Sequence, residues 1–284
     1  MGRHGPIRRA AIPVALAAYV AMMLPIAAGA QPSEGAQLPE SGRIDISYDA
    51  PADPAHQPVH DLLKRSRVLE RVRELLTVFR WPRPLRLELK SCAGESNAFY
   101  EDGVVSVCYE YVADVLRAAR SPSRPAAVSL EDAFVGPIVD VFMHEAGHAV
   151  FDLFKVPVLG REEDAADQFA AYIVLQWPKE KKHRLILGTA FGYASELKVT
   201  RPRDLTRLRL RIGRYTSYAN EHGTPAQRLF NLLCIAYGSD KELFSEVVSL
   251  GYLPGDRAES CEDEYRQVDF AYRTLIAPLV GTGP

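Results

Sequence analysis

The chain has 284 residues, with 34 Lys and Arg against 36 Asp and Glu, and 47% of its residues are hydrophobic. This apolar fraction is typical of a globular protein and too high for a disordered chain, and the length allows one large domain or two small ones. The formal net charge of -2 gives no basic footprint, so we expect no nucleic acid among its partners.

The N-terminal segment, residues 1–30, has the three parts of a secretory signal peptide. Arg3, Arg8 and Arg9 form a positive start, residues 10–24 are uncharged, and residues 28–30 read Ala-Gly-Ala, a small-x-small cleavage pattern. The alternative is an uncleaved membrane anchor, which the short apolar run and its prolines disfavour. Cleavage would leave 31 basic and 36 acidic residues, a net charge of -5. We predict an exported protein, periplasmic or secreted, that is monomeric and has no membrane contact after cleavage.

The start of the mature chain reads as a linker followed by a helix. Residues 31–58 are rich in Pro, Gly, Ser and Ala, so we predict a flexible linker there and a folded domain over residues 59–284. Apolar side chains then recur at helical spacing over residues 59–79. The prolines at positions 82 and 84 predict that this helix ends before them.

A small sheet is predicted next. Apolar and charged residues alternate over residues 85–89, the period of a half-buried strand. Residues 97–100 and 104–109 predict two more strands, joined by a turn at Glu-Asp-Gly, residues 101–103.

After the sheet the chain is predicted to be mostly helical. Because no linker divides this part, we predict one α+β domain with a small N-terminal sheet and a helical majority. The predicted helices cover residues 110–119, 129–154, 162–176, 180–196, 225–237, 241–250 and 258–277.

The four cysteines are expected to form disulfides, because their number is even and the exported compartment is oxidising. Three pairings are possible. We favour Cys92 with Cys108 and Cys234 with Cys261, because each pair encloses a short stretch that can fold back on itself. None of the cysteine spacings is Cys-x-x-Cys, so the sequence does not suggest a zinc ribbon or a redox site.

The most informative motif is His-Glu-Ala-Gly-His at residues 144–148. Two histidines four residues apart lie on one face of a helix, so His144 and His148 can bind one Zn²⁺ ion. Glu145, beside the first ligand, can then accept a proton from metal-bound water. The alternative is a pair of solvent-facing histidines, which the apolar neighbours disfavour because a buried histidine needs a partner.

An acidic run follows 15 residues after the second histidine. Its Glu-x-x-Ala-Asp pattern resembles the gluzincin branch of His-Glu-x-x-His peptidases. The resemblance implies that Glu163 is the third zinc ligand and that Asp167 accepts a hydrogen bond from the other ring nitrogen of His144. The alternative is an ordinary acidic first turn of a helix, and Glu162 or Asp164 could take the place of Glu163.

Residues 97–100 read Asn-Ala-Phe-Tyr, which resembles the Asn-Ala-aromatic sequence of thermolysin-like enzymes. That resemblance implies that Asn97 and Ala98 bind the backbone of a peptide substrate along a sheet edge. An ordinary sheet strand is the alternative.

A group that stabilises the developing oxyanion is also expected. His222 is our candidate catalytic residue for this role, with Tyr215 and Tyr218 as substitutes. A capping or surface histidine is the alternative.

The order of these motifs along residues 59–277 resembles a bacterial family of exported metallopeptidases that is largely without assigned function. The resemblance implies a zincin-like fold and a Zn²⁺-dependent peptidase, slightly favoured as an endopeptidase, whose substrate is a peptide or protein. The competing hypotheses are a non-catalytic exported module that binds zinc or peptides, and a hydrolase of non-peptide amides or esters. The segments that carry the resemblance are residues 92–110, 144–148, 161–170, 227–238 and 253–265.

Overall fold

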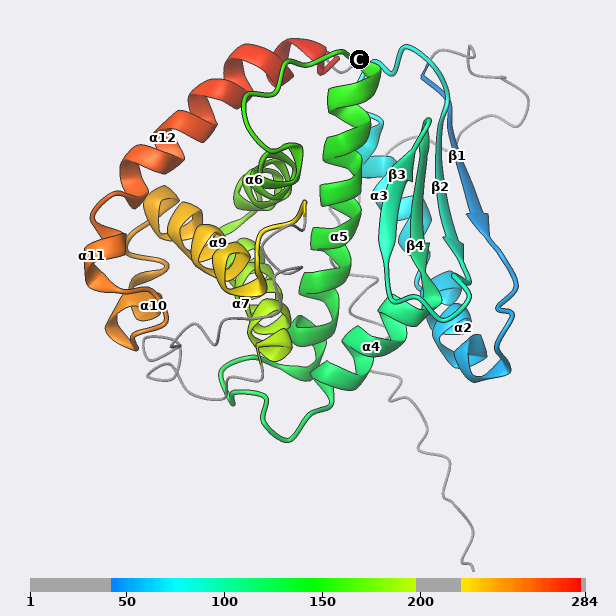
Figure 1. Cartoon of the computed structure of the whole chain (residues 1–284), viewed down its shortest axis with the longest axis horizontal. Coiled ribbons are helices and arrows are strands. Elements are labelled where there is room, and N and C mark those ends of the chain that lie inside the picture. Colours follow the sequence, from blue (N-terminus) through cyan, green and yellow to red (C-terminus); the bar gives the residue numbers. More distant parts are fainter. Residues whose placement is uncertain (1–41, 198–220, 282–284) are drawn as a thin grey trace, which may run out of the picture.

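The computed structural model describes residues 42–197 and 221–281. It confirms an α+β fold in which a small N-terminal sheet is followed by a mostly helical part (Figure 1). The predicted signal peptide lies outside the described residues.

The sheet has four strands in the order β1-β2-β4-β3. β1 pairs with β2 and β2 with β4 in parallel, whereas β3 and β4 pair antiparallel. β3 is therefore an edge strand, whose outer edge pairs with no other strand of the described part. The strands are β1 (Ile44–Tyr48), β2 (Leu85–Lys90), β3 (Ala98–Glu101) and β4 (Val104–Cys108).

β1 lies inside the segment that we predicted as a flexible linker. Ile44, Ile46 and Tyr48 alternate with polar residues, but this short pattern is surrounded by residues typical of loops. The Tyr48 hydroxyl donates a hydrogen bond to Glu70 at 2.8 Å and accepts one from the backbone N–H of Leu69 at 2.8 Å, which ties β1 to the helix behind the sheet. The described fold therefore includes β1, which precedes residue 59, where we expected the folded domain to start.

The helices follow the predicted order, with three differences in their bounds. The helix expected over residues 59–79 is two helices, because Arg67 between them has a left-handed backbone (φ 53°). The stretch 241–250 is helical only in its second half, and 258–277 is divided into several pieces. The helices are α2 (Gln57–Arg65), α3 (Val68–Leu76), α4 (Tyr109–Ala119), α5 (Leu130–Leu153), α6 (Glu162–Leu175), α7 (Lys179–Glu196), α9 (Pro225–Ser239), α10 (Ser245–Ser249), α11 (Gly255–Ala258) and α12 (Cys261–Ala271), with a short π-helix η3 (Tyr272–Ile276).

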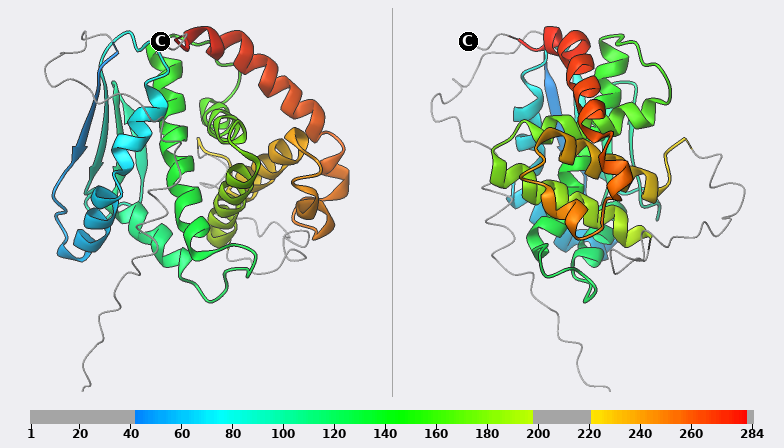
Figure 2. Two further views of the ribbon diagram at one scale, coloured as in Figure 1. Left: turned by 180° about the vertical axis from the view of Figure 1, so that it is seen from behind. Right: turned by 90° about the vertical axis from the view of Figure 1, so that its left-hand side faces the viewer.

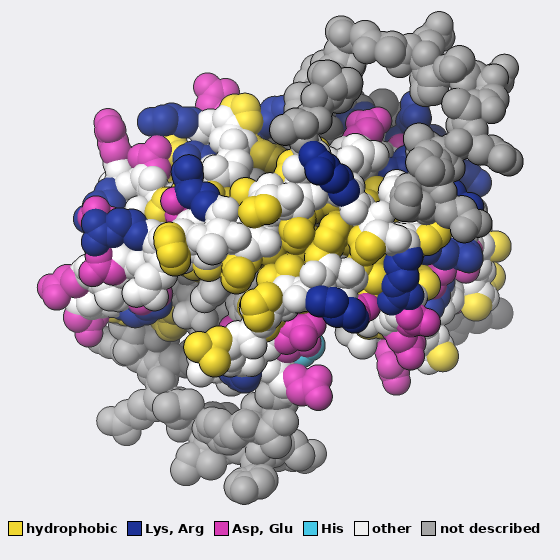
Figure 3. Space-filling model, turned by 90° about the horizontal axis from the view of Figure 1, so that it is seen from above, with side chains coloured by type: hydrophobic (Ala, Val, Ile, Leu, Met, Phe, Trp, Pro, Cys, Tyr) yellow, Lys and Arg dark blue, Asp and Glu magenta, His cyan; other side chains and the backbone are white. Residues whose placement is uncertain are grey.

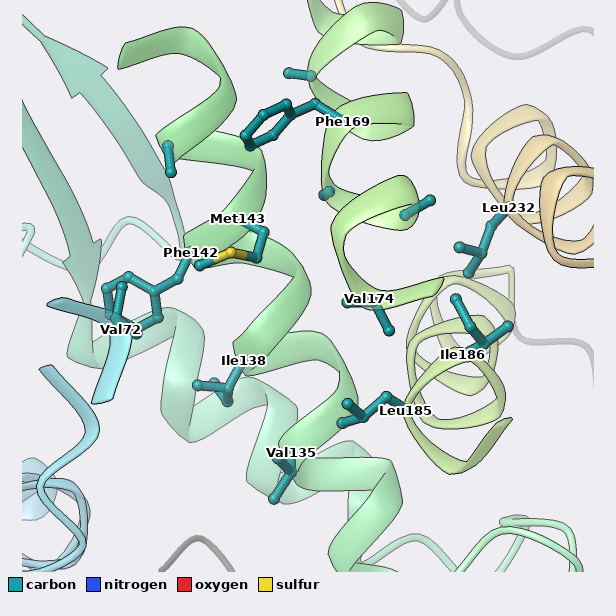
Figure 4. Close-up of a cluster of buried hydrophobic side chains, with 14 of the residues drawn as sticks. Val72, Val135, Ile138, Phe142, Met143, Phe169, Val174, Leu185, Ile186 and Leu232 are labelled. Carbon is teal, nitrogen blue, oxygen red and sulfur yellow. The ribbon is translucent and has the colours of Figure 1, made fainter. Parts of the chain in front are cut away.

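α5 is the central element of the fold. It packs beside α2 and α3 on one face of the sheet, and α6, α7 and α9 lie on its other side (Figures 1 and 2). Ser129 caps its start by accepting the backbone N–H of Asp132 at 3.0 Å. Side chains from all these layers meet around it, with Phe142 directed toward the sheet and α3, and Leu185 of α7 on the opposite side (Figure 4).

Two glycines bring α5 and α7 unusually close together. A Cβ atom on Gly188 would lie 2.0 Å from the carbonyl oxygen of Asp132, and one on Gly136 would lie 2.6 Å from the backbone nitrogen of Thr189. Larger residues at this crossing would push the helices apart. The close contact lets Tyr193 on α7 reach Asp140 on α5, where its hydroxyl donates a hydrogen bond at 2.7 Å.

The cysteines pair as predicted, Cys92 with Cys108 and Cys234 with Cys261. The first disulfide joins the end of β4 to the loop before β3, and the second joins α9 to α12. Such bonds persist in an oxidising compartment. Over residues 42–197 and 221–281, none of the helices combines the length and the apolar content needed to cross a membrane.

Candidate metal centre

The histidines of α5 and an acid of α6 meet at one point. His144 Nε2 and His148 Nε2 are 3.2 Å apart. Glu163 Oε2 lies 3.0 Å from the first and 3.4 Å from the second. The turn between the helices contains Gly160, whose positive φ of 108° suits a residue without a Cβ, so the chain can bring α6 back beside α5.

Carboxylates hold the other ring nitrogens of both histidines. His144 Nδ1 lies 2.8 Å from Asp167 Oδ1, and His148 Nδ1 lies 2.8 Å from Glu162 Oε1. A carboxylate only accepts, so each Nδ1 carries a proton, and a ring that gives up its second proton to bind a metal presents a lone pair at Nε2. Glu162, which we had considered as a substitute for Glu163, instead contacts the back of His148.

The three converging atoms fit a zinc ion. Imidazole nitrogens and carboxylate oxygens are atoms that zinc commonly binds in proteins. In tetrahedral coordination, with each zinc–ligand distance at 2.0–2.1 Å, two ligand atoms are separated by about 3.3 Å. The observed separations of 3.0, 3.2 and 3.4 Å lie on both sides of this value. Without a cation, the neutral rings and the carboxylate would place three lone pairs against one another.

His222 also reaches this cluster, from the segment just before α9. Its Nε2 lies 2.8 Å from Glu163 Oε2, and its ring stacks on that of His144 with centroids 5.8 Å apart. Ligand atoms of His144, Glu163 and His222 all lie within 4.8 Å of one another, so this set could also hold a metal ion. Tyr215 and Tyr218, the predicted substitutes for His222, lie outside the described residues.

A family model described as "Putative metallopeptidase" (DUF4344) matches residues 48–276 of the chain. The chain belongs to this family. No curated protein and no solved structure matches it. The family description implies a metal ion and the hydrolysis of peptide bonds, in agreement with the resemblance noted from the motifs, and it specifies neither the metal nor the substrate.

The side chain of Glu145 is buried beside His144, and only 5% of the surface of this residue is exposed. Burial raises the pKa of its carboxyl group, and the nearby His144 and His148 oppose that effect only in part. Among the described residues its carboxylate makes no hydrogen bond. A carboxylate with a raised pKa and no competing donor can accept a proton from a water molecule.

The cluster attracts positive charge even without a metal ion. Burial lowers the pKa of His144, but hydrogen bonds with Asp167 and Glu163 outweigh this effect and raise the pKa to about 9. Burial raises the pKa of Glu163, but its hydrogen bonds with the three histidines outweigh this effect and keep its pKa well below the usual range. A proton can bridge only one pair of these atoms at a time, whereas a metal ion can bind all of them at once. Protons and the metal ion therefore compete for the site.

Asp167 is held in turn by Arg228 of α9. The guanidinium donates two hydrogen bonds to the carboxylate, at 2.8 and 2.6 Å, and lies 4.7 Å from the centroid of the Tyr193 ring. Burial raises the pKa of Asp167, but the hydrogen bonds with His144 and Arg228 lower this pKa by more than burial raises it, so the group is ionised. The sequence motifs gave Arg228 no role, because nothing in its local pattern shows that α9 packs against α6.

The predicted substrate strand lies at the sheet edge nearest α5. Asn97 Oδ1 accepts a hydrogen bond from the N–H of Ala98 at 2.9 Å, and its carbonyl accepts one from the N–H of Cys108 at 3.1 Å. The Tyr100 hydroxyl donates to Asp152 at 2.6 Å, one helical turn beyond His148, and so ties β3 to α5. No strand of the described residues pairs with the outer backbone edge of β3.

Figure 3 shows the molecule from above, where apolar side chains form a broad band among Lys and Arg residues. A small histidine surface is visible there beside acidic side chains. The view places histidine and acidic groups together at the surface of the molecule.

Proposed function

We propose that the protein is an exported, zinc-dependent peptidase in which His144, His148 and Glu163 hold the ion. The observation that supports this most strongly is the convergence of three acceptor atoms at 3.0–3.4 Å, with both histidines oriented by carboxylates from behind. A zinc ion bound there supplies Lewis-acid chemistry, because it polarises a carbonyl group and lowers the pKa of water.

The side chains of the chain supply the proton transfers and the positioning. Glu145 accepts a proton from the attacking water molecule and delivers it to the leaving amine. Asp167 fixes the ring of His144, and the edge of β3 at Asn97 and Ala98 pairs with the substrate backbone. His222 donates a hydrogen bond to the developing oxyanion.

The competing function is a non-catalytic exported module with a closed zinc site. A structural site usually has four protein ligands, often cysteines, but both pairs of cysteines here are in disulfides. Among the described residues, the contact of His222 with Glu163 favours this alternative, because His222 could serve as a fourth ligand. The variant His222→Ala separates the two roles. A catalytic His222 leaves zinc affinity unchanged and lowers hydrolysis, whereas a fourth ligand lowers zinc affinity.

The experiment that tests the proposal measures zinc per chain and peptide hydrolysis for the mature protein beside two variants. We expect about one zinc ion in the wild type and none in His148→Ala. Glu145→Gln should keep its zinc and lose roughly 1,000-fold in kcat, within the range of general-base catalysis. A Glu145→Gln variant that cleaves peptides at the wild-type rate would exclude the mechanism. A folded, disulfide-bonded wild type that takes up no zinc would exclude the site.

A further inference from the structure

A cavity of about 280 Å³ lies between α4, α5 and α7, next to the candidate metal centre. Asp140 in its wall is one helical turn before His144, on the same side of α5. Ser96 at its other side directly precedes Asn97 and the edge strand β3. A peptide that follows β3 to the metal centre therefore runs beside this cavity.

The polar groups of the wall are mainly hydrogen-bond acceptors. Three acids line the cavity, Asp114, Asp140 and Glu196, and no Lys or Arg is among the described residues that line it. Asp114 already forms an ion pair with Arg117. The carboxylates of the other two acids form no ion pair with a Lys or Arg of the described residues.

The backbone of α5 adds a further acceptor. Pro137 lies inside the helix and has no N–H, so the carbonyl group of Ala133 lacks its usual helical donor. Both residues line the cavity. The Tyr111 hydroxyl, also in the wall, already donates to the carbonyl of Pro137 at 3.3 Å.

A positive charge of the described part of the chain, Arg228, lies behind the wall and is already engaged. Arg228 lies against the ring of Tyr193, and its guanidinium makes two hydrogen bonds with Asp167. Tyr193 donates its hydroxyl to one oxygen of Asp140, at 2.7 Å. The second oxygen of Asp140 has no hydrogen bond from a described residue.

From this arrangement we propose that the cavity binds the side chain of a lysine or arginine residue of the substrate, beside the bond to be cleaved, with Asp140 as the main specificity-determining residue. The cleavage part of this inference rests on the function proposed above, whereas the binding of a cationic side chain does not require the metal. The cavity is smaller than pockets that hold drug-sized ligands, so it suits one side chain. A neutral side chain would leave the carboxylate without its charged partner, and pockets built around such groups discriminate strongly.

The test compares peptide amides that differ at a single residue, lysine or norleucine, with that residue placed at each position in turn. Binding to the full mature chain carrying Glu145→Gln is measured by calorimetry, both with zinc and after its removal. We expect the best lysine peptide to bind at least tenfold more tightly than its norleucine partner. In the active protein, the ratio of kcat/KM for the same pair should favour lysine at least as strongly.

Variants then assign the preference to the cavity. Asp140→Asn should lower the lysine preference to less than threefold, and Glu196→Gln should reduce it in part. Glu180→Gln removes the same charge from an exposed position at the start of α7 and should leave the preference unchanged. If Asp140→Asn fails to fold by its thermal transition, Glu196→Gln alone decides.

Each outcome identifies what has failed. Hydrolysis that shows no lysine preference overturns the cavity assignment and leaves the proposed function standing. Lysine-dependent binding that requires Asp140, without hydrolysis, supports the cavity and contradicts the peptidase. A lysine preference that persists in both Asp140→Asn and Glu196→Gln overturns the role of this cavity.

Discussion

The two sides of the His144 ring lie in opposite kinds of polar surroundings. On the Nδ1 side the donors and the acceptor match, since Asp167 accepts hydrogen bonds from both His144 and Arg228. On the Nε2 side, two acceptor atoms, His148 Nε2 and Glu163 Oε2, converge on His144 Nε2.

This difference separates structure from chemistry within one residue. Buried donors and acceptors that satisfy one another rigidify a fold and need nothing from outside. Converging acceptors are costly to bury unless a cation joins them. The Nδ1 side therefore serves the protein alone, whereas the Nε2 side requires a ligand.

The largest expected effect tests the Nε2 side, by adding zinc to the metal-free protein. An ion that binds only the folded state at 1,000 times its dissociation constant raises the free energy of unfolding by about 4 kcal/mol. Chemical unfolding with and without zinc measures this difference. The double variant His144→Ala/His148→Ala should show no zinc-dependent gain, and an equal gain in that variant would place the ion elsewhere.

The next effect tests the surroundings of the Nδ1 side through pH, at Asp140, whose charge acts on that of Asp167. Burial raises the pKa of Asp140 to about 6, above its ordinary value of 3.8, so the folded state keeps a proton that the unfolded state loses. Stability from this group is therefore lost as pH rises from 4 to 6, and Asp140→Asn removes that loss. The groups that face Asp140 are Tyr111, His144, Asp167, Tyr193 and Arg228.

The measurement for Asp140 is urea unfolding of the metal-free wild type and variant between pH 4 and pH 7. The free energy of unfolding of Asp140→Asn, relative to the wild type, should increase over this interval by up to about 3 kcal/mol. Parallel curves would show that Asp140 titrates normally and that its surroundings are wetter than the structure indicates.

The sequence predicted the local features well, because each had a local cause. The helical spacing of His144 and His148, the alternation in β2 and the capping serine before α5 are all readable over a few residues. The disulfide pairing followed from short separations along the chain. Glu163 was predicted as a zinc ligand from a resemblance to known peptidases; its Oε2 lies 3.0 Å from His144 Nε2, and its role as a ligand stays a prediction.

What the sequence did not predict depends on contacts between distant segments. Arg228 lies 61 residues from Asp167, and only the packing of α9 on α6 brings the two together. The cavity at Asp140 requires the close crossing of α5 and α7 at Gly188. β1 was missed for another reason, because five residues of strand pattern lay within a segment whose composition is typical of loops.

A smaller effect tests whether the two sides of His144 act together. Asp167→Asn removes the charged acceptor that fixes the protonated Nδ1, so the ring can turn or adopt the wrong tautomer. Loss of such a partner typically lowers metal affinity by 10- to 100-fold. Competition for zinc with a chromophoric chelator measures this, and Glu246→Gln, far from the centre on α10, is the control. Unchanged affinity in Asp167→Asn would show that the two sides are independent.

The smallest expected effect concerns Arg228, which acts on the metal only through Asp167. Arg228→Lys keeps the positive charge but loses the two-pronged hydrogen bond, since an ammonium group cannot match the carboxylate geometry. We expect zinc affinity to fall by about three- to tenfold, less than for Asp167→Asn, because Asp167 still contacts His144.

Nitrogen NMR of the His144 ring provides a readout that is independent of catalysis, because it reports which ring nitrogen carries the proton. A larger loss in Arg228→Lys than in Asp167→Asn would mean that Arg228 supports the centre by a route other than this carboxylate. Equal losses in Arg228→Lys and Arg228→Gln would show that the geometry of the guanidinium, rather than its charge, holds Asp167 in place.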